Sequence, residues 1–515
     1  MTFDERIIRV DSSAQGKVLS EWLRENGHMI LLPCGGRGVC GKCRVKVIDG
    51  VFLNVADRAP ATPDSDGCVK SCQVLCGAGE AHIKLPLHEA TGLSVEHESE
   101  KITTENCGAD NNKHYSAALD IGTTTLAMAL VELESGKVVA SETCLNPQHS
   151  YGADVISRIS ACASGYLNEM RDCVLKAVRS LLNSLLSGKS TTAETMIVVG
   201  NTTMLHIFSG VSPESMGAYP FKPSFTDMRE FSGDDIDLSA KKVVLLPSVS
   251  AFIGADIVSG MLVAQMNLSN KPSLLVDIGT NGEMVLWSGK EFVCASAAAG
   301  PALEGGNISC GTGGIPGAIS RVYQKENTIC YKTINDKAPS GICGCGLVDL
   351  IALLLDMGEL DETGCLDDDT YRLEAVHEIE ALDVSSLTPA DTQVELTQKD
   401  IREFQLAKSA IRAGIEALAC EADVSLNDIF KIYIAGGMGY YMDPAKAARI
   451  GMIPEEFIDK VQVCGNTALA GAVRCVIDPA LLTKASEYAS QCKTLELNSS
   501  HVFSDSFIEN MMFPE

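Results

Sequence analysis

Residues 119–123 read LDIGT, and residues 276–280 read VDIGT. Each copy ends an apolar stretch, passes through a Gly-Thr turn and enters a second apolar stretch, at residues 126–133 and 283–287. A carboxylate at a strand end, a glycine whose backbone N–H can approach an anion, and an adjacent hydroxyl together suit a phosphate group. The repeat therefore predicts two related α/β halves that face each other across a cleft and hold a triphosphate.

Three polar side chains near these turns are the predicted catalytic residues. We expect Asp120 and Asp277 to hold Mg²⁺ through water, because carboxylate oxygens suit this small, hard cation. Asn201 ends another apolar stretch and would line the side of the terminal phosphate, although a helix N-cap is an equally good interpretation of this residue. His206, on the helix expected next, is interpreted as a buried core residue. The turns supply the predicted phosphate contacts, namely Gly122, Thr123, Thr124, Gly279, Thr280, Asn281 and Gly282.

Five ordered motifs resemble the actin, Hsp70 and sugar-kinase superfamily of ATP-binding proteins. Besides the two phosphate turns, residues 247–260 and 465–471 look like its connecting helices, whose small residues would let two helices cross closely at a hinge. Residues 434–439, IAGGMG, look like its adenosine loop. The resemblance implies a duplicated RNase H-like fold. It also implies that the ribose and base of ATP pack against Gly436, Gly437 and Gly439.

A second glycine loop is a candidate for the adenine side of the same site. Residues 340–347 read SGICGCGL. Cys343 and Cys345 in this loop are interpreted as small packing residues in preference to metal ligands.

Residues 34–43 read CGGRGVCGKC and carry three thiols at C-x5-C-x2-C spacing. Thiolates at this spacing can close around iron, and the glycines let backbone N–H groups turn toward the sulfur atoms. A fourth ligand must follow, and Cys68, Cys72 and Cys76 compete for this place. We favour Cys72 because it directly precedes the last expected strand, where a β-grasp ferredoxin returns to its cluster. A zinc knuckle would need a second Cys or His pair, and none stands at a suitable spacing. The predicted ligands of a [2Fe-2S] cluster are therefore Cys34, Cys40, Cys43 and Cys72.

The composition limits the classes of function. A formal net charge of −26 argues against nucleic acid, whose binding depends on neutralising phosphates. No apolar run reaches the roughly 18 residues that span a bilayer, and the N-terminus lacks the features of a signal peptide. We therefore expect a cytoplasmic protein that does not bind membranes. Its 20 cysteines are not expected to form disulfides and fit a reducing, anaerobic cytosol.

Changes in composition divide the chain into three parts. Residues 1–86 alternate like short strands around one short helix, which predicts a ferredoxin-like [2Fe-2S] domain. Residues 87–115 are polar, acidic and aperiodic, as in a linker. Residues 116–515 would form the ATPase, with halves at about 116–265 and 272–480 and a C-terminal tail. The predicted fold class is thus a multidomain α/β protein, with a β-grasp ferredoxin domain before the duplicated ATPase fold.

The whole combination resembles the ferredoxin-containing reductive activators of corrinoid proteins. Besides the cysteine loop, its marks are SCQ at 71–73, GNTTM at 200–204, AGPALEGGNISC at 299–310 and MMFP at 511–514. The resemblance implies an ATP-hydrolysing enzyme that reduces a corrinoid protein from Co(II) to Co(I) through a [2Fe-2S] cluster, in a corrinoid methyltransferase system. It implies ATP and Mg²⁺ as cofactors, a corrinoid protein and an upstream electron donor as partners, and it allows a homodimer.

Two alternatives remain open on the sequence alone. One is an ATP-gated electron donor to another low-potential enzyme, like the activators of 2-hydroxyacyl-CoA dehydratases, although those lack a ferredoxin domain. The other is a redox and nucleotide sensor that binds and releases partners without turnover. ATP hydrolysis that rises on adding a corrinoid protein would distinguish the first interpretation from both.

Overall fold

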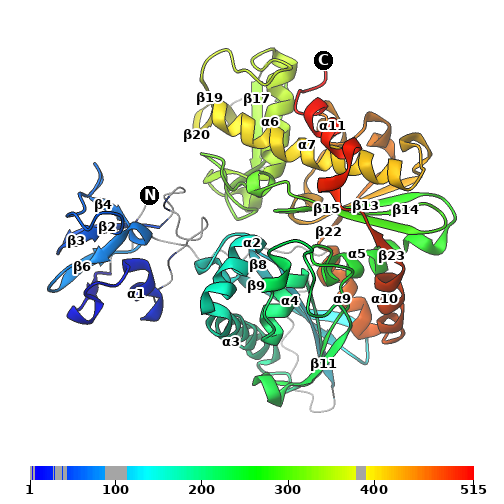
Figure 1. The fold of residues 1–515 in the computed structure, drawn as a ribbon. Helices are drawn as coiled ribbons and strands as arrows, with labels where there is room; N and C mark the ends of the chain where they lie inside the picture. The colour runs from blue at the N-terminus through cyan, green and yellow to red at the C-terminus, as the bar shows by residue number, and fades with distance from the viewer. Residues whose placement is uncertain are drawn as a thin grey trace.

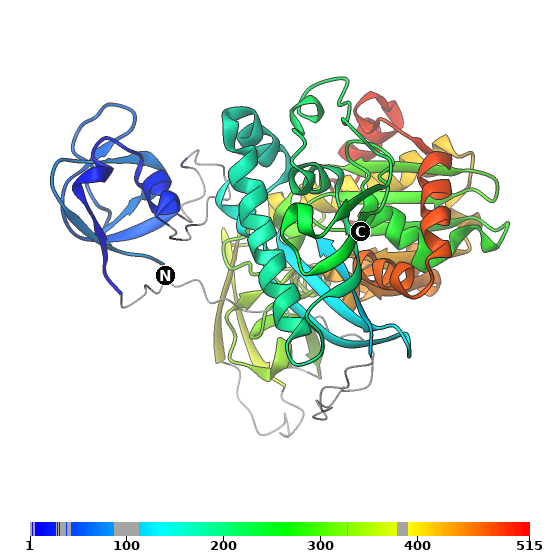
Figure 2. The ribbon, with the colours of Figure 1, turned by 90° about the horizontal axis from the view of Figure 1, so that it is seen from below.

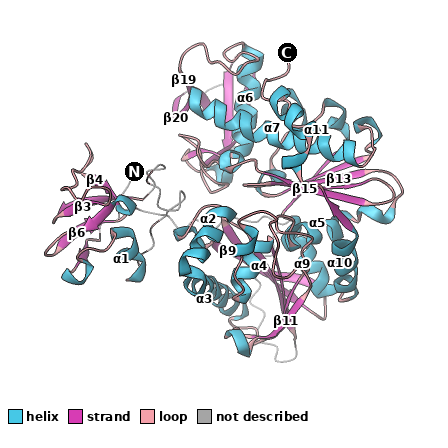
Figure 3. Cartoon of the chain, viewed as in Figure 1, coloured by secondary structure: helices cyan, strands magenta, loops and turns pink. Residues whose placement is uncertain are grey.

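The computed structural model describes residues 6–26, 43–86, 113–326, 328–378 and 390–515, together with Phe3, His28, Ile30 and Gly38. Its strands form five sheets, whose arrangement with the helices is shown in Figures 1 and 3. In the described part of the chain, none of the helices combines the length and the apolar character of a bilayer span.

The N-terminal unit is an antiparallel sheet with one helix packed against it. Its strands follow the order β1-β6-β2-β4, and β3 pairs with β5. Alternation explains the sheet, because Val45 of β2 is buried while Lys46 is exposed. Helix α1 completes the core with Leu19, Trp22 and Leu23. The elements are β1 (Ile8–Val10), α1 (Leu19–Glu25), β2 (Arg44–Asp49), β3 (Phe52–Asn54), β4 (Cys68–Lys70), β5 (Val74–Cys76) and β6 (Ala81–Lys84).

The first repeat motif lies in a six-stranded sheet of order β11-β12-β10-β7-β8-β9. Strands β7, β8 and β9 form an antiparallel meander, and β10 runs parallel to β7 and β12. The long helix α3 lies across the strands of this sheet (Figure 2). The elements of this half are β7 (Tyr115–Ile121), β8 (Thr125–Glu132), β9 (Lys137–Leu145), α2 (Val155–Ala161), α3 (Leu167–Leu186), β10 (Ala193–Gly200), α4 (Thr202–Ser209), β11 (Arg229–Ser232), β12 (Ala240–Leu245) and α5 (Ala255–Ala264).

The second repeat motif lies in another six-stranded sheet, of order β22-β21-β13-β14-β15-β23. Strands β13, β14 and β15 again form an antiparallel meander, and β21 runs parallel to β13. The two sheets thus share a five-strand plan, and the extra strands β11 and β23 sit at opposite edges. The strands are β13 (Ser273–Ile278), β14 (Gly282–Trp287), β15 (Phe292–Ala297), β21 (Lys431–Ala435), β22 (Val461–Gly465) and β23 (Cys492–Thr494).

A third large sheet, of order β18-β16-β17-β19-β20, is inserted into the second half and has no counterpart in the first. Its core is continuous with that of β13 and β14 through helices α6 and α7. The remaining elements are β16 (Ala318–Lys325), β17 (Thr328–Thr333), β18 (Gly341–Ile342), α6 (Gly344–Met357), β19 (Thr370–His377), β20 (Ala390–Thr397), α7 (Gln398–Glu421), α8 (Pro444–Arg449), α9 (Thr467–Ile477), α10 (Ala480–Gln491) and α11 (His501–Glu509).

Helices α9 and α10 return to the first half, although they follow the second sheet in sequence. Ala472 and Val473 of α9 and Tyr488 of α10 are buried in one core with Leu119 of β7 and Val198 of β10. The expected division of the ATPase at residues 265 and 480 did not anticipate this return. It links the halves a second time, because the chain crosses between them both before β13 and after β22.

Helices α5 and α9 cross in close contact between the halves. The Ser259 hydroxyl donates a hydrogen bond to the Ala468 carbonyl at 2.6 Å. A Cβ on Gly471 would lie 2.3 Å from the Ser259 carbonyl oxygen, and one on Gly260 would lie 3.0 Å from Thr467 Oγ1. The small residues of the two connecting segments are therefore needed for the helices to approach this closely.

His206 is part of the core of the first half. Its Nδ1 donates to the Thr202 carbonyl at 2.7 Å, its Nε2 accepts from the Ser224 N–H at 3.1 Å, and its ring stacks on Phe225. The side chain is fully buried. Burial lowers the pKa of His206 from its ordinary 6.5 to about 4, so the neutral ring is a packing residue that satisfies two backbone groups.

Substitution of Gly471 tests the helix crossing. In Gly471→Ala, the new methyl group collides with backbone of α5, and we expect a loss of about 2 kcal/mol of folding free energy despite the better helix propensity of alanine. Thermal unfolding by calorimetry measures this loss. The matched control is Gly414→Ala in α7, where the nearest atoms to a Cβ belong to the movable Met284 side chain. Equal stability of the two variants would contradict the required close approach.

The low pKa of His206 makes folding sensitive to acid. The unfolded chain binds a proton on this ring near the ordinary pKa of 6.5 and the folded chain only near 4, so stability is present above this window and falls as pH decreases through it. We expect the ring to remove about 2 kcal/mol of stability between about pH 7.5 and about pH 5. Urea unfolding of wild type and His206→Gln, followed by far-UV circular dichroism at both pH values, measures this. An identical pH dependence in the two proteins would contradict it.

Candidate nucleotide and iron–sulfur sites

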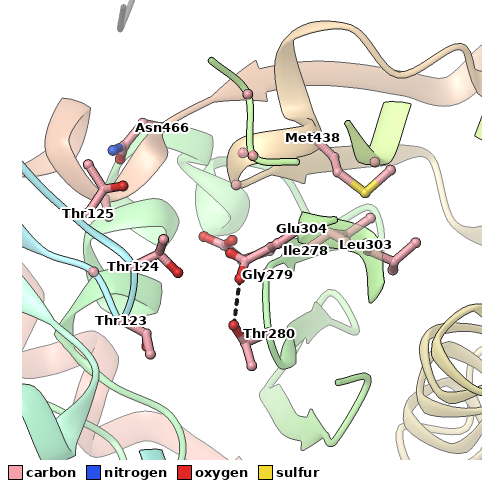
Figure 4. A pocket seen from close by; sticks show the side chains of 18 of the residues that line it. Thr123, Thr124, Thr125, Ile278, Gly279, Thr280, Leu303, Glu304, Met438 and Asn466 are labelled. Atoms are coloured by element: carbon pink, nitrogen blue, oxygen red, sulfur yellow. Dashed lines mark hydrogen bonds between the residues drawn. The ribbon is translucent and has the colours of Figure 1, made fainter. Parts of the chain in front are cut away.

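A cavity of about 310 Å³ lies between the two halves and is lined by both repeat turns (Figure 4). Most of the predicted nucleotide-site residues line it. Gly282 does not: a Cβ there would lie 2.2 Å from Ile411 of α7, so this glycine is needed for packing of the second sheet on its helix. Gly439 lies in the turn of residues 437–440, beside the cavity-lining Gly437. The predicted residues in the lining are Asp120, Gly122, Thr123, Thr124, Asn201, Asp277, Gly279, Thr280, Asn281, Gly436 and Gly437.

The first turn is held in shape by side chains around it. The Gly122 N–H donates to the Thr125 carbonyl at 3.0 Å, and the Asn146 amide donates to the Gly122 carbonyl at 2.8 Å. The buried Arg158 guanidinium donates to the Thr123 carbonyl. Together these contacts fix the backbone of the turn where it lines the cavity.

Asn201 is a helix N-cap that also lines the cavity, and its place beside the terminal phosphate stays a prediction. Its Oδ1 accepts a hydrogen bond from the Met204 N–H at 2.9 Å, so it is the N-cap of α4. Its Nδ2 donates to Thr123 Oγ1 at 3.2 Å. The helix cap therefore also connects α4 to the first phosphate turn, and the residue lines the cavity.

Carboxylates are concentrated in this cavity. The pKa of Asp277 is raised to about 8, mainly by burial and further by the charges of Asp256, Asp120 and Glu304. Burial likewise raises the pKa of Asp120 to about 7 and that of Asp256 to about 6, and it raises the pKa of both Glu283 and Glu304. Such a set can stay ionised together only beside a cation.

The donor chemistry of this set fits Mg²⁺, which prefers oxygen ligands and keeps several waters. Among the described residues, no three His, Cys, Asp or Glu side chains meet closely enough to hold a metal ion by themselves.

Three of these acids were missed by the sequence analysis. Asp256 is the acidic residue in the first turn of the otherwise apolar helix α5. A single carboxylate in an apolar segment could have indicated a functional residue. Glu283 lies opposite Asp277 in the pairing of β13 and β14. Glu304 stands within the glycine-rich segment 299–310. Another missed contact is Asn466, the N-cap of α9, whose amide donates to Asp120 Oδ2 at 2.9 Å.

The predicted adenosine loop touches the second phosphate turn. Gly436 has a φ of +91°, and a Cβ there would lie 2.5 Å from the Ile278 carbonyl oxygen, so only glycine fits. The Cys345 thiol donates to the Met438 carbonyl at 3.3 Å, and Cys343 and Cys345 both line the cavity. The glycine loop at 340–347 therefore meets the adenosine loop, and its two cysteines are packed in the wall between them.

The cluster-binding loop is described only in part. Cys34 and Cys40 lie outside the described residues. Cys43 Sγ and Cys72 Sγ are 3.2 Å apart, and this hydrogen bond lowers the pKa of the Cys43 thiol to about 6. The Gln73 amide lies 3.6 Å from Cys72 Sγ. Two thiols, one of them readily ionised, and a nearby amide donor fit a site for iron–sulfur ligation.

The competing cysteines have other surroundings. Cys68 Sγ lies 3.8 Å from the Asp66 carbonyl oxygen. Burial raises the pKa of the Cys76 thiol to about 11, which disfavours the thiolate that iron requires. The contact of Cys72 with Cys43 supports its choice as fourth ligand, which stays a prediction.

Comparison with known proteins gives one consistent result along the chain. Residues 2–77 match the 2Fe-2S iron-sulfur cluster binding domain, residues 115–269 match the RACo middle region, and residues 271–515 match the C-terminal domain of RACo, the ASKHA domain. These matches confirm the predicted fold class of a ferredoxin domain followed by an actin-like, Hsp70-like ATPase fold.

Named relatives agree with these domain matches. The chain is 30% identical over 425 residues to the corrinoid activation enzyme RamQ of Eubacterium limosum, covering 78% of this chain and 70% of that protein. It is 26% identical over 415 residues to the [Co(II) methylated amine-specific corrinoid protein] reductase of Methanosarcina barkeri, covering 73% and 72%. A solved structure of the reductive activator for corrinoid, iron-sulfur protein superposes with a TM-score of 0.70 at 26% identity, covering 98% of this chain and 96% of that one. The chain therefore belongs to the family of ferredoxin-containing reductive activators of corrinoid proteins.

Proposed function

We propose that this protein uses ATP to return a corrinoid protein from Co(II) to Co(I), with the electron passing through a [2Fe-2S] cluster near its N-terminus. The observation that carries this proposal is the presence, in one chain, of the paired Cys43 and Cys72 thiols and of the acidic cavity between two phosphate turns. The relatives named as a corrinoid activation enzyme and as a reductase of a Co(II) corrinoid protein support the choice of substrate.

The energy scale makes ATP coupling reasonable. For one electron, a gap of about 100 mV in reduction potential costs roughly 2.3 kcal/mol. A difference of about 1–3 kcal/mol in binding between two conformations is common for proteins with two coupled sites. Closure of the halves about the α5–α9 crossing could therefore offset such a gap by binding the corrinoid protein more tightly in one nucleotide state than in another.

The chain's own residues have separate tasks in this scheme. Asp120 and Asp277 would hold Mg²⁺ through water, and the ion would neutralise charge on the phosphates when bound. The backbone N–H groups and hydroxyls of the turns at 122–124 and 279–281 bind and orient the phosphate oxygens. Asn201 holds the first turn through Thr123, and Gly436 and Gly437 provide a flat contact for the nucleoside.

The cluster site has its own division of labour. Cys34, Cys40, Cys43 and Cys72 would hold the [2Fe-2S] cluster, which supplies a one-electron carrier when bound. Its partners in electron transfer would be an upstream reductant and the corrinoid protein. We further propose that residues 1–86 form the ferredoxin domain, 87–115 the linker and 116–515 the ATPase, and that the chain pairs as a homodimer through the ATPase.

Removing the carboxylate of Asp277 tests the coupling. In Asp277→Asn, we expect the rate of ATP-dependent Co(I) formation to fall at least about a hundredfold, because a preorganised charge at the nucleotide is lost. Anaerobic mixing with a Co(II) corrinoid protein and reductant, followed by the Co(I) absorption with and without ATP, measures it. Asp237→Asn is the matched control, since this side chain is exposed and pairs with Arg179 on the surface. Equal reduction without ATP, or by Asp277→Asn, would contradict the proposal.

Alanine variants of three cysteines test the fourth cluster ligand. We expect Cys72→Ala, purified anaerobically, to lose the visible absorption of the cluster and most of its iron, because a three-cysteine site cannot complete the cluster. Cys68→Ala and Cys76→Ala should keep both. ATP binding by all three variants serves as the control for folding of the remainder of the chain. A coloured, iron-loaded Cys72→Ala protein beside a colourless Cys68→Ala or Cys76→Ala protein would reassign the ligand.

A further inference from the structure

Glu304 is a carboxylate that is hydrogen-bonded to the second phosphate turn and lines the same cavity as the first. It ends the short turn Pro301–Glu304, which follows β15. Its Oε2 accepts a hydrogen bond from Thr280 Oγ1 of the second turn at 2.6 Å (Figure 4). The hydroxyl of Thr124, in the first turn, lies near enough to the same carboxylate to oppose part of the rise that burial causes in the Glu304 pKa. Figure 4 shows Thr124 on one side of the cavity and Thr280 with Glu304 on the other.

This position coincides with the expected place of the terminal phosphate. The argument rests on the proposed function, in which ATP binds between the two turns. A phosphoryl group held by hydroxyls of both turns must lie between Thr124 and Thr280, and Glu304, which is hydrogen-bonded to Thr280, borders this space. A carboxylate repels a phosphate group, so Glu304 is not suited to bind the phosphate itself. The attacking water needs an acceptor for its proton, and a carboxylate can supply it.

The other carboxylates of the cavity have different partners. Asp120 and Asp277 end strands β7 and β13, and Asp120 accepts from Asn466. Asp256 accepts from the Ile257 N–H at the start of α5. Glu283 accepts from Asn281 at 3.2 Å. Among the described acids of this cavity, Glu304 is the one whose carboxylate accepts a hydrogen bond from a hydroxyl of a phosphate turn.

The backbone around Glu304 fixes its position. A Cβ on Gly305 would lie 2.2 Å from the Thr312 carbonyl oxygen, and one on Gly344 would lie 1.9 Å from the Leu303 carbonyl oxygen. The turn is therefore packed tightly against the start of α6. On the cavity side, Gly279 adjoins the carboxylate, because a Cβ there would be in ordinary contact with Glu304 Oε1 at 3.4 Å. Burial raises the pKa of Glu304, which makes the carboxylate a stronger proton acceptor.

We propose that Glu304 is the catalytic residue that orients the attacking water and takes its proton during ATP hydrolysis. Thr280 holds the carboxylate before ATP binds, and Thr124 and Thr280 donate to the terminal phosphate afterwards. The water oxygen forms a bond to the γ-phosphorus, and the bond from that phosphorus to the bridging oxygen breaks. ADP leaves with the electron pair, the proton of the water passes to Glu304, and the carboxyl group releases it to solvent when phosphate departs.

Single-turnover hydrolysis of ATP by Glu304→Gln tests this role. The amide keeps the size and the hydroxyl contacts of the side chain but cannot take a proton. We expect the hydrolysis rate to fall about 100-fold or more, while the affinity for a fluorescent ATP analogue changes less than about threefold. Glu291→Gln is the matched control, since this glutamate lies on the surface in an ion pair with Lys493 and should hydrolyse ATP like wild type.

A second variant separates proton transfer from structural support. In Glu304→Ala, added formate should restore part of the lost hydrolysis, because a small carboxylate can enter the vacated space and act as the base. A Glu304→Gln protein that hydrolyses ATP within about twofold of wild type would overturn the assignment. The assignment would also be overturned if the hydrolysis rate of Glu304→Ala fell in proportion to its nucleotide affinity and formate did not restore it.

The outcome is distinguishable from failure of the proposed function. Wild type is assayed in parallel for ATP-dependent Co(I) formation with a corrinoid protein. If wild type requires ATP for this reduction but Glu304→Gln hydrolyses normally, only the role of Glu304 fails. If wild type reduces the corrinoid protein equally well without ATP, the coupling fails, and the hydrolysis rates still decide the role of Glu304.

Discussion

The contact between helices α5 and α9 is the constraint on which the nucleotide cavity depends. Ser259 and Ala468 share a hydrogen bond there, and the two backbones lie too close for any side chain at position 471. Both helices also begin at the cavity, α5 with Asp256 in its first turn and α9 with Asn466 as its cap. A change in the crossing angle would therefore move groups of the site directly, without a chain of intermediate contacts.

Charge in the cavity is unbalanced among the protein groups that line it. Five carboxylates line the cavity, and burial together with repulsion from neighbouring acids raises the pKa of Asp277 to about 8. The buried Arg158 lies behind the first turn and donates to the Thr123 carbonyl, and burial lowers its pKa only to about 10, so it stays charged. A cationic guanidinium behind the turn and a cation in front of the acids would together make the site suitable for a triphosphate.

The same chain combines two kinds of chemistry that need different surroundings. The paired thiols of Cys43 and Cys72 lie in a small antiparallel sheet unit with its own core. The nucleotide cavity lies between two larger sheets, which the proposed function requires to move about the α5–α9 crossing. A rigid cluster site limits reorganisation during electron transfer, whereas a hinged cavity can convert nucleotide binding into a change of shape. The proposed reductive activation requires both properties.

The sequence by itself determined those features that depend on neighbouring residues. The two Gly-Thr turns and their flanking strands follow from local alternation and turn chemistry, and the cysteine spacing around Cys43 follows from the geometry of thiolate ligation. The small residues at 254–260 and 465–471 indicated a close helix crossing. Local pattern could not choose between a helix cap and a place in the cavity wall for Asn201, because the residue occupies both. It also could not identify the hydrogen-bond partners of His206.

Only the tertiary structure decided which distant groups meet. Gly282 belongs to the same local motif as Gly279, yet it faces Ile411 of α7 instead of the cavity. Glu304 accepts a hydrogen bond from Thr280 although it stands in a segment outside both repeats, and α9 returns to the first sheet after the second is complete. These contacts join residues that are far apart in the chain, and they arise from burial of apolar faces between whole elements. No window of neighbouring residues contains that information.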